Sequence, residues 1–203
     1  MDVAAFVEEH LPPTPAYVLE IGCGAGDLAR GIARLGYRTV AIDPRAPDGE
    51  IFERVSLEDF TGPGPFDAVL ANRALHHIPD LGGALDKVAR LLRPGGRLIV
   101  HAHAWDRVDE STARWYLEQR RLVDPTAPGS VESCLADWTA DHPGLHGYYD
   151  MRAALDQHFR ERFFAWTPYL YTAMGGMQVE AEECDLIEAG KIQAVGFSYV
   201  GET

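Results

Sequence analysis

The sequence has few cysteines and no long apolar run. Cys23, Cys134 and Cys184 are its only cysteines, and no two of them form a CxxC pair. An odd number of thiols without metal-ligand spacing is typical of a reducing compartment. No stretch approaches the roughly 18 apolar residues of a membrane span. The first ten residues, MDVAAFVEEH, carry acid instead of the basic start of a secretory leader. We therefore expect a cytoplasmic protein that does not enter a membrane.

Basic residues are also scarce. The 203 residues include 18 Lys and Arg against 31 Asp and Glu, which gives a formal net charge of −13. Proteins that bind nucleic acid need a basic surface to neutralise phosphates, so this balance argues against a nucleic-acid partner. The one modest cluster is Arg114, Arg120 and Arg121, which we interpret as a solvated helix face. The sequence does not indicate an oligomeric state.

Short apolar segments alternate with helical patterns through the first half of the chain. The expected strands are 16–22, 37–44, 51–56, 66–72 and 97–104, and the expected helices are 3–11, 27–36 and 81–92. Such alternation is typical of a parallel sheet that carries helices on both faces. Ligands of these folds bind at the carboxyl ends of the strands.

The second half is less regular. Residues 105–158 are expected to be mainly helix and loop, inserted after the fifth strand, and late strands are expected at 161–171 and 191–200. The segment 180–190 between these two strands is too short for a crossover helix with its loops, so we expect an antiparallel pair at the sheet edge. The sequence thus predicts one domain over 1–203, in which the insertion 105–158 is a lid over an acceptor.

The segment VLEIGCGAGDLA, residues 18–29, is the most informative part of the sequence. Gly22, Gly24 and Gly26 follow an apolar run, as in loops that hold a ligand against bare backbone. A dinucleotide loop reads GxGxxG, whereas this one has Asp27 at the last position and Glu20 just before the first glycine. Two carboxylates beside a pyrophosphate are unfavourable by about 1 kcal/mol each. A ligand with cationic groups, such as S-adenosylmethionine, suits the loop better.

Asp43 supports a nucleoside ligand. It lies about 20 positions beyond the first glycine, at the end of the second expected strand, where a carboxylate can accept from both ribose hydroxyls. Dinucleotide enzymes share this feature, so Asp43 does not discriminate between the two ligand classes, but Glu20 does.

Four motifs in order resemble the class I S-adenosylmethionine-dependent methyltransferases. They are ExGxGxG at 20–26, the acid Asp43, FDAVLANRALHHIPD at 66–80 and LLRPGGRLIV at 91–100. The resemblance is close over about residues 15–101. It implies a Rossmann-like, doubly wound α/β sheet of seven strands whose last strand is antiparallel, and S-adenosylmethionine as cofactor.

The resemblance also implies the cofactor contacts. Glu20, Gly22 and Gly24 would lie at the methionine end and Asp43 at the ribose, with Cys23 and Gly26 completing the loop. Ser56 and Leu57 would border the adenine, and Ala71 and Asn72 would face the methionine and the methyl group. The family often has an acidic residue where Ser56 stands, and Glu58 or Asp59 would substitute for it here. Cys23 is expected to be a small residue between glycines and not a nucleophile.

His76, His77 and His103 are the candidate catalytic residues. Imidazole titrates near neutral pH, so each suits a general base for an acceptor hydroxyl. A His pair at 76–77 is common in the resembling family whatever the acceptor, which favours a packing role. His101 and His103 are two apart on a strand and should point to one face. A metal there would need a third ligand, such as His142 or His146, and the spacing specifies none, so we expect no metal.

The proposed reaction is methyl transfer to a small-molecule acceptor whose O, N, S or C nucleophile stays open. The family's NPPY motif is absent because Arg73 follows Asn72, which disfavours nucleobases and glutamine amides as acceptors. Two alternatives remain at this point. One is an NAD(P)-dependent oxidoreductase, and the other is a module that binds S-adenosylmethionine without catalysis.

Overall fold

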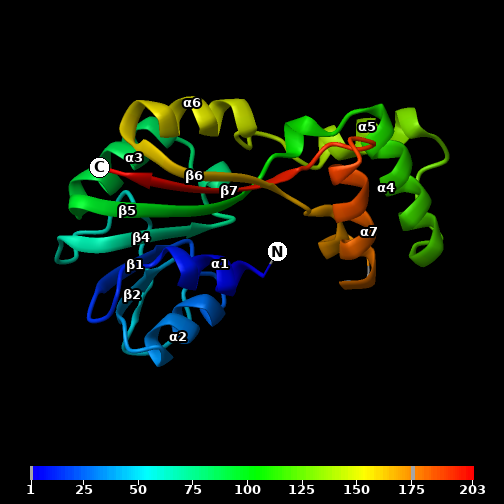
Figure 1. Cartoon of the computed structure of the whole chain (residues 1–203). Helices are drawn as coiled ribbons and strands as arrows, with labels where there is room; N and C mark the ends of the chain where they lie inside the picture. The colour runs from blue at the N-terminus through cyan, green and yellow to red at the C-terminus, as the bar shows by residue number, and fades with distance from the viewer. Residues whose placement is uncertain (1, 175–176) are drawn as a thin grey trace.

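The computed structural model describes residues 2–174 and 177–203, without the side chains of 177 and 178. Seven strands form one sheet in the order β3-β2-β1-β4-β5-β7-β6 (Figure 1). Their bounds are β1 Tyr17–Ile21, β2 Arg38–Ile42, β3 Phe52–Glu53, β4 Phe66–Asn72, β5 Leu92–His103, β6 Arg160–Thr167 and β7 Gly196–Glu202. The strand β7 is antiparallel to both of its neighbours, and the pairs among β1 to β5 are parallel. The predicted sheet with an antiparallel last strand is confirmed.

Helices cover both faces of the sheet. One face packs on α3 (Leu81–Leu91) and α6 (Tyr148–His158), and the other on α1 (Val3–His10) and α2 (Asp27–Arg34). Neighbouring residues of β1 therefore point to opposite faces. Leu19 packs in the core that contains α3 and α6, and Val18 packs in the core that contains α1 and α2. Figure 1 shows α6 above the sheet and α2 below it. The fold is therefore doubly wound, as predicted, and a doubly wound sheet binds its ligand at the carboxyl ends of the strands.

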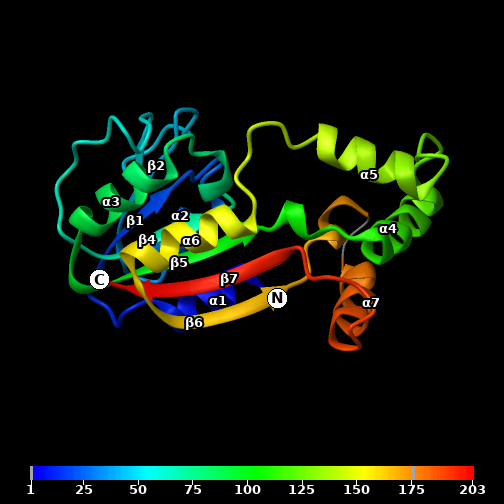
Figure 2. The same ribbon diagram turned by 90° about the horizontal axis from the view of Figure 1, so that it is seen from above.

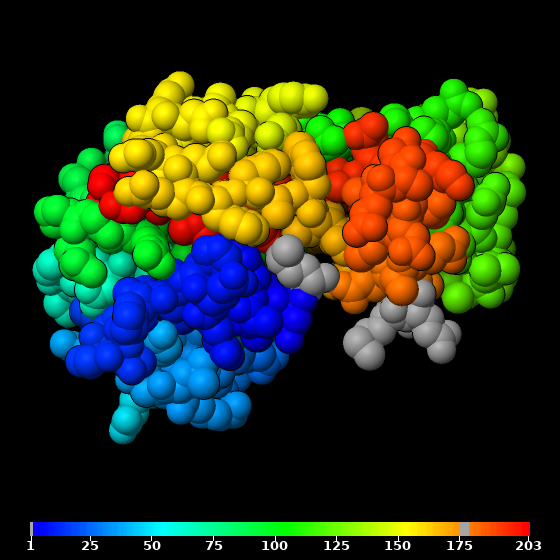
Figure 3. Space-filling view, in the orientation of Figure 1, coloured from blue at the N-terminus to red at the C-terminus, as the bar shows by residue number. Residues whose placement is uncertain are grey.

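Three other helices gather beyond one end of the sheet. They are α4 (Glu110–Val123), α5 (Val131–Ala140) and α7 (Met177–Glu188), and Figures 2 and 3 show them together at one end of the molecule. Their shared core contains Trp115, Tyr116, Cys134 and Leu170. The insertion 105–158 is thus divided, because α4 and α5 join α7 whereas α6 lies on the sheet.

Helix α7 lies between the two late strands. It includes residues 180–188 of the segment that we expected to be too short for a crossover helix with its loops. The expected antiparallel pairing of β6 with β7 is confirmed. The two facts are compatible because α7 does not cross the sheet. It turns outward and packs on α4, where Trp115 Nε1 donates to Glu182 Oε1 at 2.9 Å.

Several strand ends also differ from expectation. Strand β5 begins at Leu92, and the register slips from Phe66↔Leu92 to Ala68↔Arg97, so the residues 93–96 bulge out of the pairing. Strand β6 stops at Thr167 because Pro168 has no N–H for a further ladder bond, and a 3-10 turn, η3 (Leu170–Ala173), follows. No helix in the described part of the chain is long and apolar enough to cross a membrane.

Candidate functional site

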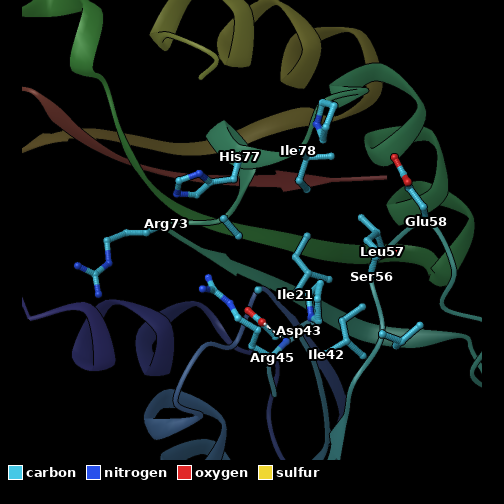
Figure 4. A pocket seen from close by; sticks show the side chains of 15 residues that line it. Ile21, Ile42, Asp43, Arg45, Ser56, Leu57, Glu58, Arg73, His77 and Ile78 are labelled. Carbon is cyan, nitrogen blue, oxygen red and sulfur yellow. Dashed lines mark hydrogen bonds between the residues drawn. The ribbon is translucent and has the colours of Figure 1, made fainter. Parts of the chain in front are cut away.

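Two adjoining cavities open at the carboxyl ends of the central strands. The larger has a volume of about 520 Å³ and the smaller about 400 Å³, and both are lined by Gly22, Arg73 and His77. Figure 4 shows the larger cavity, with Asp43 and Arg45 on one wall and His77 and Ile78 on the other. The two cavities together form one cleft across β1, β2 and β4, which is where a doubly wound sheet binds its ligand.

The glycine loop has a backbone that other residues could not easily adopt. Gly22 has φ +70, and a Cβ there would lie 2.6 Å from the Cβ of Ala74. Gly26 has φ +81, and a Cβ there would lie 2.4 Å from the ring of Phe52. The Gly22 N–H donates to the carbonyl of Ile42 at 2.8 Å, which ties the loop to β2. Gly22, the loop residue that lines both cavities, therefore presents backbone and no side chain at their junction.

Glu20 lines the smaller cavity and is only 2% exposed. Burial raises the pKa of its carboxyl to about 8, although a hydrogen bond with the backbone of Ala29 opposes this shift. Its Oε2 has no hydrogen-bond partner among the described residues. A buried carboxyl of this kind is mostly protonated at neutral pH, and a cation beside it would favour the charged form.

Asp43 lines the larger cavity and is held by backbone N–H groups. Its Oδ2 accepts from Gly24 at 3.1 Å and its Oδ1 from Arg45 at 2.7 Å. These bonds orient the carboxylate at the end of β2. The fold thus brings Asp43 against the glycine loop, although the two are far apart in the sequence.

Ser56 and Leu57 line the larger cavity. The Ser56 hydroxyl donates to Asp59 Oδ2 at 2.9 Å and accepts from the Asp59 N–H at 3.2 Å. Glu58, by contrast, lines the cavity itself. Of the two acids proposed to replace the family's residue at position 56, Glu58 is thus the one on the cavity wall.

Asn72 and Ala71 separate at the end of β4. Asn72 lines the smaller cavity, and its Oδ1 is buried without a partner in the described structure. Ala71 is packed in the core formed with α3 and α6 and lines neither cavity.

Cys23 lines the smaller cavity, where burial raises the pKa of its thiol to about 11. A thiol with that pKa is protonated near neutrality and is a poor nucleophile.

The three candidate histidines have different surroundings. His76 is buried, lines the smaller cavity and has no partner for Nδ1 in the described structure, and burial lowers its pKa to about 4. His77 is exposed and lines both cavities. His103 lines neither, because the ring of Tyr169 is stacked on it at 4.1 Å, and burial lowers its pKa to about 3. His76 and His103 are therefore neutral near pH 7.

The paired strand histidines point to one face, as predicted. The rings of His101 and His103 both lie against Tyr169, with centroid separations of 6.5 and 4.1 Å. Within the described ranges, no group of three or more His, Cys, Asp or Glu side chains is arranged to hold a metal ion.

Comparison with known proteins gives the family. A family model described as a methyltransferase domain matches residues 2–165. The chain belongs to this methyltransferase family. The resemblance drawn from the sequence motifs is confirmed, and the nicotinamide oxidoreductase alternative falls away.

The known proteins that resemble this methyltransferase-family protein align with different fractions of its length. A ubiquinone biosynthesis O-methyltransferase of Xylella fastidiosa is 35% identical over 111 residues, which are 47% of this chain and 45% of that protein. The chain thus matches less than half the length of that relative. The structure of an S-adenosylmethionine-dependent methyltransferase of Mesorhizobium loti superimposes with a TM-score of 0.63. The match covers 100% of this chain and 99% of that protein's chain, at 17% sequence identity. The structure of a 1,6-didemethyltoxoflavin N1-methyltransferase of Burkholderia thailandensis, which contains S-adenosylhomocysteine, superimposes with a TM-score of 0.59. The match covers 98% of this chain and 76% of that protein's chain, at 19% sequence identity. At such identities the two structures establish a shared fold.

Two residues that line the cavities of this methyltransferase-family protein were not identified from the sequence as site residues. Arg73 lines both cavities, and its position directly after Asn72 could have revealed it. Tyr169 lines the smaller cavity from beyond the end of β6, and nothing local in the sequence marks it. Among the described residues, none of 105–158 lines either cavity, so the role of that insertion as a lid stays a prediction.

Proposed function

We propose that the protein transfers a methyl group from S-adenosylmethionine to a small-molecule acceptor. The observation that carries the proposal is Glu20, a buried carboxyl with an unpartnered oxygen beside a glycine loop. Such a group is unfavourable unless a ligand supplies a cation or a donor. When bound, the cofactor supplies an electrophilic methyl group on a sulfonium, which leaves as a neutral thioether.

The residues present fit that cofactor along the whole cleft. Glu20 would pair with the ammonium group, and the loop from Gly22 to Gly26 would admit the amino-acid part against backbone. Asp43, already oriented by Gly24 and Arg45, would accept from the ribose hydroxyls. Ser56 and Leu57, together with the apolar Ile42, Val55 and Ile78, line the larger cavity, where a planar adenine ring would bind.

The acceptor would enter beside Asn72, His76 and Tyr169, which share the smaller cavity with Glu20. The free Nδ1 of His76 can hydrogen-bond an acceptor hydroxyl, but a pKa of about 4 makes this imidazole a weak base. The chain would therefore act mainly by alignment and by excluding water, and alignment can supply roughly 7 to 11 kcal/mol of a barrier. The relative named as an O-methyltransferase supports a hydroxyl acceptor.

The insertion 105–158 would complete the acceptor site. Trp138 and His142 contact the ring of His103 with centroid separations of 5.5 and 5.2 Å, and His103 supports Tyr169 on the cavity wall. A shift of α5 would thus reach the cavity through the edge contact of Trp138 with His103 and the stacking of His103 on Tyr169, which supports a lid role. We further propose a cytoplasmic location and no nucleic-acid partner. The free thiols of Cys23, Cys134 and Cys184 support the first point, and the net charge of −13 supports the second.

Calorimetry with S-adenosylhomocysteine and NAD⁺ tests the proposal. We expect the protein to bind S-adenosylhomocysteine and not NAD⁺. Glu20→Gln and Asp43→Ala should each weaken binding by about tenfold or more, as expected for loss of a charged hydrogen bond. The matched control is Glu118→Gln, an exposed carboxylate of α4, which should bind like the wild type. Unchanged affinity in both site variants would remove the basis of the proposal.

A further inference from the structure

Arg73 has an unusual backbone for a large residue. With φ +53 it is the one described residue other than glycine in the left-handed region. Its N–H donates to the carbonyl of His101 at 2.7 Å, which anchors this conformation to β5. Strained backbone of this kind persists where the surrounding structure imposes it, and it is frequent at ligand sites. The result is that a long cationic side chain starts at the junction of the two cavities and lines both.

Arg73 makes no ion pair with a described carboxylate, although acids line the same cavities. Seven other arginines form ion pairs with carboxylates, namely Arg30, Arg54, Arg93, Arg114, Arg120, Arg152 and Arg162. Within the described ranges Arg73 forms none, and its charge opposes the rise that burial causes in the pKa of Tyr169. Its charge also reaches His76 and His101, where, after burial, it helps to lower both pKa values. Arg73 is thus an exposed cation without an ion pair in the described structure, although its two cavities are also lined by acids such as Glu20 and Asp43.

The smaller cavity therefore has both a carboxyl and a cation on its wall. Glu20 supplies a carboxyl whose Oε2 has no described partner and which a bound cation would ionise, Arg73 supplies a guanidinium without an ion pair, and the backbone of the glycine loop lies in the same wall. An α-amino acid has its ammonium and its carboxylate on one carbon atom, so a receptor for it needs both signs around one point. A guanidinium suits the second role because its planar fork can donate two parallel hydrogen bonds to a carboxylate.

We infer that Arg73 is the carboxylate receptor of this site and pairs with the carboxylate of the methionine part of the cofactor. This inference rests on the proposed function, because it assumes that S-adenosylmethionine occupies the cleft. Two charged contacts at one carbon fix the direction in which the chain from that carbon to sulfur leaves the loop, and thereby place the sulfur relative to Asn72. Arg73 would also let the site distinguish the complete cofactor from adenine nucleosides that have no amino-acid part.

Two ligands and three variants test this inference by calorimetry. S-adenosylhomocysteine has the amino-acid part, and 5′-methylthioadenosine has the same nucleoside and sulfur without it. Arg73→Asn removes the charge with a residue that tolerates left-handed backbone, and Arg73→Lys retains the charge. Arg45→Gln is the matched control, since Arg45 lines the larger cavity next to Asp43. Thermal unfolding of each variant verifies that it is folded.

We expect Arg73→Asn to weaken the binding of S-adenosylhomocysteine by about 10- to 100-fold and the binding of 5′-methylthioadenosine by less than about twofold. Arg73→Lys should recover part of the loss, and Arg45→Gln should keep the wild-type ratio of the two affinities. Normal S-adenosylhomocysteine binding by Arg73→Asn, or equal loss for both ligands, would overturn this inference alone. A wild-type protein that binds neither ligand would overturn the proposed function and the inference with it.

Discussion

Glu183 on α7 holds Tyr169 in place, because its Oε1 accepts the Tyr169 N–H at 2.8 Å. The same carboxylate accepts from Leu170 at 3.1 Å and from Tyr171 at 2.8 Å, and it is fully buried. Tyr169 in turn stacks on His103 and lines the smaller cavity. A helix outside the sheet thus positions one wall of the candidate site through one side chain.

Glu183→Gln should destabilise the protein by about 1–3 kcal/mol, because an amide presents one acceptor oxygen to three backbone N–H donors that are buried or partly buried. The loss should be measured by urea unfolding, with S-adenosylhomocysteine affinity as a second readout that falls as Tyr169 loosens. The neighbouring exposed Glu182→Gln is the control, since the amide oxygen of that variant can still accept from Trp115 Nε1, and its effect should stay within about 0.5 kcal/mol. Equal losses in both variants would contradict the role given to Glu183.

Binding of S-adenosylhomocysteine should strengthen as pH rises toward 8. The Glu20 pKa is raised to about 8 in the ligand-free protein, so binding a cation below that pH requires proton release. Affinity should increase by up to about tenfold per pH unit between pH 6 and 8 and then level off. Calorimetry in buffers of different ionisation enthalpy measures the released proton. Glu20→Gln is the control for titration of the ligand itself, and a slope identical to that of the wild type would refute the assignment.

Glu20 should also make the ligand-free protein less stable at higher pH. Its folded pKa of about 8 lies above the ordinary value of 4.5, so the folded state binds more protons between these two values. Stability from this group is complete below pH 4.5 and declines by at most about 1.4 kcal/mol per pH unit as pH rises toward 8. Glu20→Gln should therefore match the wild type near pH 4.5 and exceed it at pH 8. Urea unfolding at both pH values measures the difference, and parallel pH profiles would count against this account.

Two glycines of the α2 region should respond oppositely to alanine. Gly22→Ala places a Cβ 2.6 Å from that of Ala74 at φ +70, so it should cost about 1–3 kcal/mol and weaken S-adenosylhomocysteine binding. Gly31→Ala adds a Cβ within α2 that meets nothing within 4 Å, so helix propensity should raise stability by up to about 1 kcal/mol. Thermal unfolding with and without ligand measures both. A neutral Gly22→Ala would show that the loop can relax.

The sequence by itself determined the parts of the site that follow from local pattern. Apolar segments alternating with helical periods specify a doubly wound sheet, and the carboxyl ends of parallel strands share one edge. Glu20, the glycines, Asp43 and Asn72 all lie at or near such strand ends, and the structure brings them to one cleft. Their placement required no knowledge of contacts between distant segments.

Only the tertiary structure decided what depends on contacts between segments far apart in the sequence. Tyr169 reaches the cavity because Glu183 binds its backbone, and it covers His103, which we had proposed as a catalytic residue. Ala71 lies in the core although its neighbour Asn72 faces the cleft. The pKa values of the buried Glu20 and His103 depend on desolvation by residues from several elements. Periodicity encodes which residues form an element, whereas burial and the direction of a side chain depend on the elements that pack around it.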